Sequence, residues 1–87
     1  MQVILCNVNL FSASAVQVID TDTNNIIFTQ NVTSDNIVPA VCALANKLDI
    51  NEIRISGNKN YTMGFVEDIK STYSLNFNNN NINVEVI

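Results

Sequence analysis

Alternating hydrophobic and polar positions predict strands over the first third of this 87-residue chain. Residues 3–10 and 13–20 are rich in β-branched side chains, and the short Phe11-Ser12 link between them predicts an antiparallel pair. Residues 20–25 carry Asp, Thr and Asn side chains that bond their own backbone, so they predict a turn into a third strand at residues 26–30.

Hydrophobic residues recur at helical spacing after this meander and predict a helix from about residue 35. They are Ile37, Val41, Leu44, Ala45 and Leu48. Thr33, Ser34 and Asp35 offer side-chain oxygens for the N-cap. Pro39 lies within or just after the first turn, where a missing N–H costs least.

A strand at residues 52–56, a second helix from about residue 60 and a closing strand at residues 82–87 complete the pattern. The hydrophobic face of the second helix consists of Phe65, Val66, Ile69 and Tyr73. We expect Gly64, near the start of this helix, to let the helix approach the sheet closely, because glycine has no side chain.

The element order β-β-β-α-β-α-β defines an α/β fold in one domain, residues 1–87. Right-handed crossovers then give a mixed sheet of strand order 3-2-1-4-5 with both helices on one face. The other face remains uncovered and of mixed polarity. Its candidate partner-binding residues are Asn7, Asn9, Gln17, Arg54 and Asn83.

Each candidate on the uncovered face also has a plain structural interpretation. Asn7 and Asn9, at same-face positions of the predicted first strand, can bond neighbouring strands or interact with water. Arg54 can anchor an interface, since Arg is common in hot spots, or it can form a rim ion pair with Glu52 or Glu85. The sequence leaves these alternatives open.

Charge and composition exclude several classes of function. Four Lys/Arg against eight Asp/Glu give a net charge of −4, so no basic surface is available for nucleic acid. The chain has no His, and Cys6 and Cys42 lack the spacing of a metal or redox pair, so we expect no metal, no cofactor and two reduced buried thiols. No stretch is long and apolar enough to span a membrane, and the start has no basic signal-peptide region, which favours a cytoplasmic location.

The order of elements resembles the ribonuclease H-like fold, which ribonucleases H share with the actin-like ATPases. The strand that ends at Ser56-Gly57, followed by Gly64 at the opening of a helix, is similar to an actin-like segment. The resemblance implies a phosphate-binding or metal-binding family, but the matching residues are changed. The first strand offers amides in place of a metal-binding carboxylate, Phe11-Ser12-Ala13 lacks a phosphate-loop glycine, and Asn58 replaces a second glycine.

The sequence therefore predicts a protein that is not an enzyme. The first hypothesis is a small interaction module that binds another protein or itself, and that acts as a phage or mobile-element accessory protein. The alternative is nucleotide or anion binding at Ser56, Gly57, Asn58 and Lys59, where backbone N–H groups open the second helix. An ordinary turn capped by Asn58 or Asn60 is the simpler interpretation of the same residues.

Overall fold

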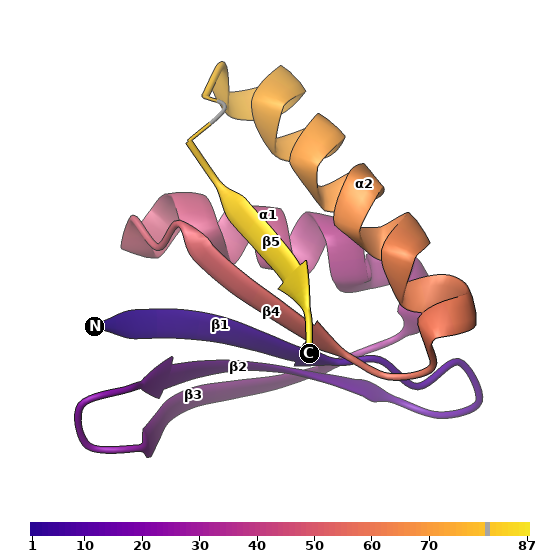
Figure 1. The fold of residues 1–87 in the computed structure, drawn as a ribbon, viewed down its shortest axis with the longest axis horizontal. Coiled ribbons are helices and arrows are strands. Elements are labelled where there is room, and N and C mark those ends of the chain that lie inside the picture. The colour runs from indigo at the N-terminus through magenta and orange to yellow at the C-terminus, as the bar shows by residue number, and fades with distance from the viewer. Residues whose placement is uncertain (80) are drawn as a thin grey trace.

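The computed structural model describes residues 1–79 and 81–87 and has five strands and two α-helices in those ranges (Figure 1). The elements are β1 (Gln2–Asn7), β2 (Ser14–Asp20), β3 (Asn25–Val32), a 3₁₀ turn (Ser34–Asn36), α1 (Ile37–Leu48), β4 (Glu52–Ser56), α2 (Lys59–Phe77) and β5 (Asn83–Val86).

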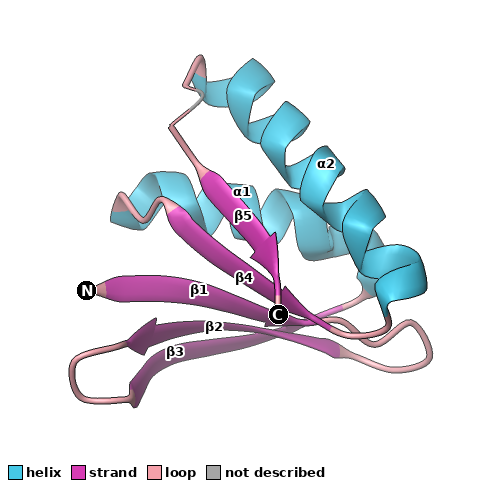
Figure 2. Cartoon of the chain, viewed as in Figure 1, coloured by secondary structure: helices cyan, strands magenta, loops and turns pink. Residues whose placement is uncertain are grey.

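The strands form one mixed sheet in the order β3-β2-β1-β4-β5, which confirms the predicted topology (Figure 2). The meander β1-β2-β3 is antiparallel, whereas β4 runs parallel to β1 and β5 parallel to β4. Each parallel step is bridged by a helix, as parallel strands require. The regular pairing of β2 with β3 is interrupted by a bulge, at which Ile27 is the extra residue.

Both helices cover the same side of the sheet, as predicted. β4 and β5 pass in front of α1 in Figure 1, and α2 packs on α1 and β5. The fully buried hydrophobic centre of the core consists of Ile4, Cys6, Val16, Val18, Ile37, Val41, Cys42, Ala45, Ile53, Ile55 and Ile69. These residues come from β1, β2, β4 and both helices, so one hydrophobic layer joins the sheet to the helices.

The start of α1 differs from the prediction. The chain first makes a 3₁₀ turn, and the α-helix begins at Ile37 and not near residue 35. Within the described chain, neither Thr33 nor Asn36 accepts a backbone N–H at its N-cap, so the predicted side-chain cap is wrong. The Thr33 hydroxyl oxygen instead accepts a hydrogen bond from the side-chain Nδ2 of Asn36 at 3.0 Å. Pro39 is the third residue of α1, where no intrahelical N–H is lost.

The start of α2 depends on Gly57 and Asn58. Gly57 has a φ of +145°, which L side chains rarely adopt, and the Asn58 side chain caps the helix by accepting the Asn60 N–H at 2.9 Å. The prediction for Gly64 is wrong. It is exposed, and a β-carbon on it would meet no described atom within 4 Å, so Gly64 faces solvent and not the sheet.

Candidate functional site

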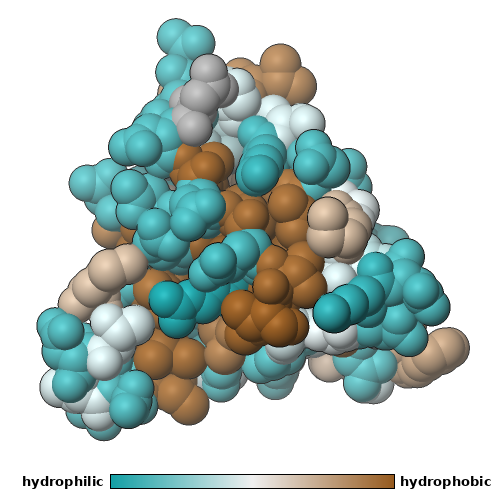
Figure 3. All heavy atoms as spheres, viewed as in Figure 1, coloured by the Kyte–Doolittle hydropathy of each residue, from teal (hydrophilic) through white to brown (hydrophobic). Residues whose placement is uncertain are grey.

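The side of the sheet that faces away from both helices, here called the open side, is the main candidate surface. The strand registers place alternate residues of β1, β2, β4 and β5 on it. They are Val3, Leu5, Asn7, Ala15, Gln17, Ile19, Glu52, Arg54, Ser56, Asn83 and Glu85. Hydrophobic side chains lie near the middle of this side, with hydrophilic ones around them (Figure 3).

The polar half of the open side contains a charged row on β4 and β5. Arg54 and Glu85 are paired across the two parallel strands, and Arg54 Nε lies 3.4 Å from Glu85 Oε1. Asn83 donates to Glu52 Oε2 at 3.0 Å in the same row. The sequence left Glu52 and Glu85 open as ion-pair partners of Arg54, and in the structure the partner is Glu85. Both side chains of this ion pair are substantially exposed, so the pair adds little stability and its groups remain accessible to a partner.

The hydrophobic half lies on β1, β2 and the beginning of β3. Val3 is buried although no helix covers it, and its direct neighbour on β2 is Ile19. Leu5 and Ile19 are half-buried, and Ile26, opposite Ile19, is 57% exposed. The open side is therefore more hydrophobic on its β2 and β3 flank than the sequence pattern indicated.

The amide residues proposed from the sequence do not all lie on this surface. Asn7 is exposed on it, and its side-chain oxygen accepts a hydrogen bond from the Ser56 hydroxyl. Gln17 is half-buried beside it on β2. Asn9 lies outside β1, because the strand ends at Asn7, so the expectation that Asn7 and Asn9 share one strand face is wrong.

Asn9 belongs instead to the loop between β1 and β2. Its side-chain oxygen accepts the Phe11 N–H at 3.0 Å, and its backbone N–H and carbonyl both bond the buried Ser14 hydroxyl, at 2.9 and 3.2 Å. A local side-chain turn of this kind ends a strand where β propensity alone would continue it. The loop displays Phe11, which is 99% exposed. The sequence did not indicate that Ser14 would bond Asn9 or that Phe11 would be fully exposed, because no motif reports either property.

The turn from β4 to α2, proposed as an anion site, already uses much of its hydrogen-bonding capacity. The Asn58 side chain accepts from Asn60 N, and the Asn58 carbonyl accepts from the N–H groups of Tyr61 and Thr62, both at 3.2 Å. Lys59 is exposed at the first position of α2. An anion at Ser56, Gly57, Asn58 and Lys59 would compete with the asparagine cap, and the anion site stays a prediction.

The two cysteines are free and buried, as predicted. Burial raises the pKa of each thiol from 9.0 to about 11, so both are protonated near neutral pH. Among the described residues, no group of three or more Cys, Asp or Glu side chains is placed to hold a metal ion. No helix in the same residues is long and apolar enough to cross a membrane.

Comparison of the chain with protein-family models gave no match, and a search of curated proteins also gave none. The resemblance to ribonuclease H-like proteins therefore depends on topology and on the residues around Gly57.

Proposed function

We propose that this chain is a small interaction module without enzymatic activity, of degenerate ribonuclease H-like type, which binds a protein partner through the open side of its sheet. The observation that supports the proposal best is the one-sided arrangement of layers, since α1 and α2 lie on the same side (Figure 1). The exposed surface joins a hydrophobic area near Leu5 and Ile19 to a polar row that contains Arg54. A hydrophobic centre with a polar rim is the usual anatomy of a protein interface.

Arg54 is the residue that we expect to contribute most to partner binding. The Arg54 guanidinium group is only loosely held by Glu85, at 3.4 Å. Arg54 is the middle residue of β4, which lies between the parallel strands β1 and β5. A partner carboxylate can take the place of Glu85 or join the pair, because guanidinium groups bond two acceptors at once. Asn7, Gln17 and Asn83 supply neutral hydrogen-bonding groups around it.

We further propose a cytoplasmic location and a role as a phage or mobile-element accessory protein that acts on a host protein. A compact chain of net charge −4 with no His supports a binding role rather than an acid–base or metal-dependent one.

The experiment is a capture of partners from lysate of the native host by three forms of the protein. They are the wild type, Arg54→Ala on the open side, and Lys70→Ala on the exposed face of α2. Both variants remove one positive charge, so a difference between them does not come from the change in net charge. We expect a partner that Lys70→Ala retains and Arg54→Ala loses. Equal retention by both variants would contradict binding through the open side.

A further inference from the structure

The outer edge of β3 carries large hydrophobic residues that nothing in the described chain covers. Ile26, Ile27 and Phe28 follow one another in the sequence, and their exposed fractions are 57%, 53% and 42%. Runs of exposed hydrophobic residues in a strand are avoided unless a partner covers them. β3 is also an edge strand, so one row of its backbone N–H and C=O groups faces outward.

These hydrophobic residues lie on both sides of the sheet. Ile26 is opposite Ile19 and therefore belongs to the open side, whereas Phe28 is opposite the buried Val18 and therefore faces the helices. A partner that docks on one side of the sheet covers only one of them. A strand that pairs alongside β3 covers both Ile26 and Phe28, because its own side chains alternate between the two sides of the sheet.

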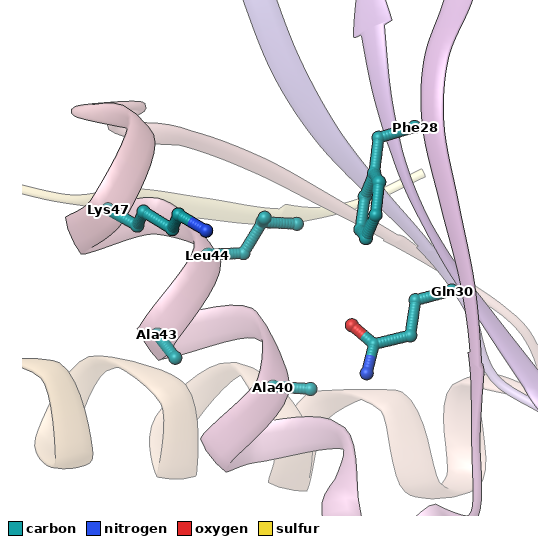
Figure 4. A pocket seen from close by; sticks show the side chains of 6 residues that line it. All are labelled: Phe28, Gln30, Ala40, Ala43, Leu44 and Lys47. Carbon is teal, nitrogen blue, oxygen red and sulfur yellow. The ribbon is translucent and has the colours of Figure 1, made fainter.

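On the helix side, the edge borders a groove between β3 and α1. It has a volume of about 260 Å³ and is lined by Phe28 and Gln30 from the strand and by Ala40, Ala43, Leu44 and Lys47 from the helix. Phe28 and Leu44 extend into this space from opposite walls (Figure 4). Phe28 forms part of the strand wall of this groove and is 42% exposed, so the helix-facing side chains of an added strand would lie next to it.

The two edges of the sheet differ in how they are protected. β5 is four residues long and carries Glu85, and short charged edges resist pairing. β3 is eight residues long and contains no charged residue, no Pro and no Gly, and beyond the bulge at Ile27 its residues 28–32 form a regular strand. Two β3 strands can therefore lie side by side without repulsion between like charges along the seam, although each copy has a net charge of −4.

We propose that two copies of this chain form a dimer by antiparallel pairing of β3 with β3, which joins their sheets into one continuous sheet. A two-fold axis necessarily makes this pairing antiparallel, and it uses the same edge of each copy, so the assembly closes at two. This inference depends on the proposed function, because it names a second copy as one partner of the interaction module. It uses the β3 edge and leaves Arg54 free on the open side.

The test is sedimentation velocity from micromolar to millimolar concentration, on the wild type, Thr29→Lys and Asn81→Lys. Thr29 is exposed near the middle of β3, so lysines there meet their symmetry mates near the axis, and Asn81→Lys adds the same charge beside β5. We expect a wild-type dimer that Asn81→Lys preserves, and for Thr29→Lys a dissociation constant raised on the order of tenfold or more. A wild type that stays monomeric, or equal dimerisation of both variants, overturns the proposal.

Single cysteines at Thr29, Gln30, Asn31 and Asn81 give a second readout that does not depend on weakening the dimer. The native thiols are buried, so oxidation reports the introduced ones. We expect disulfide-linked dimers whose yield peaks at one β3 position and is lowest at position 81. A flat profile, or a maximum at position 81, overturns the proposal. If β3 pairing fails while partner capture still depends on Arg54, the proposed function stands without the dimer.

Discussion

Gly57 approaches Val8 so closely that a β-carbon on the glycine would lie 3.1 Å from the Val8 carbonyl oxygen. The same β-carbon would lie 3.2 Å from the Thr62 methyl group, and the backbone at Gly57 has a φ of +145°. Three segments meet at this point: the end of β1, the end of β4 and the first turn of α2. Gly57 therefore fixes how α2 leaves the sheet.

We expect Gly57→Ala to destabilise the protein by about 1–3 kcal/mol, because alanine is strained at this φ and its methyl group would press on backbone. Urea denaturation followed by circular dichroism measures the change. A variant as stable as the wild type would show that the chain relieves this contact easily.

Gly64→Ala is the matched control and has the opposite expected sign. Gly64 lies in the interior of α2, exposed, and a β-carbon would meet nothing within 4 Å in the described chain. Alanine should stabilise the helix by about 0.5–1 kcal/mol, because it has less backbone freedom to lose on folding. The same urea titration tests this, and a loss of stability would mean that Gly64 does contact the sheet, as its sequence position first indicated.

Thr62 is fully buried, and its hydroxyl has no hydrogen-bond partner among the described residues. Thr62→Val keeps the shape and removes the unsatisfied group, so we expect a gain on the order of 1 kcal/mol in the free energy of unfolding. Thr72→Val, on the same helix but only half-buried, should change stability less. If Thr62→Val is the more destabilising of the two, the hydroxyl has a partner, such as a bound water.

The thiols of Cys6 and Cys42 predict a loss of stability at alkaline pH. Each pKa is 9.0 in an unfolded chain and about 11 in the folded protein, so the folded state holds its thiol protons longer. The resulting stabilisation is complete below pH 9 and is lost as pH rises toward 11, by about 2–3 kcal/mol for each thiol. Along this range the unfolding free energy of the wild type should fall more steeply with pH than that of Cys6→Ala, which keeps only the Cys42 thiol. Parallel pH profiles would contradict a raised thiol pKa at Cys6.

The regular parts of the fold could be predicted from sequence because the hydrophobic period was clear there. In β4, Ile53 and Ile55 alternate with polar residues, and in α1 Ile37, Val41 and Ala45 recur at helical spacing, so the burial of each was correctly assigned. Right-handed crossovers then left one strand order.

The irregular parts depend on contacts that no periodicity reports. β1 ends early because Asn9 and Ser14 bond each other across the loop, and the bulge at Ile27 places Ile26 and Phe28 on opposite sides of the sheet. Gly64 was misplaced because a glycine gives no sign of which way its helix face points. The predicted strand order already placed the third strand at an edge, but the exposure of Ile26, Ile27 and Phe28 was not visible, since Ile and Phe in a strand normally indicate core.

Hydroxyl-radical footprinting of the captured complex, compared with the free protein, tests most directly whether the sheet and not the helices binds the partner. It measures the solvent access of individual side chains. We predict that oxidation falls at Leu5 and Ile19 on the open side and is unchanged at Met63 and Leu75, which are exposed on α2. Protection of Met63 and Leu75 with Leu5 and Ile19 unchanged would place the interface on the helices and contradict the account.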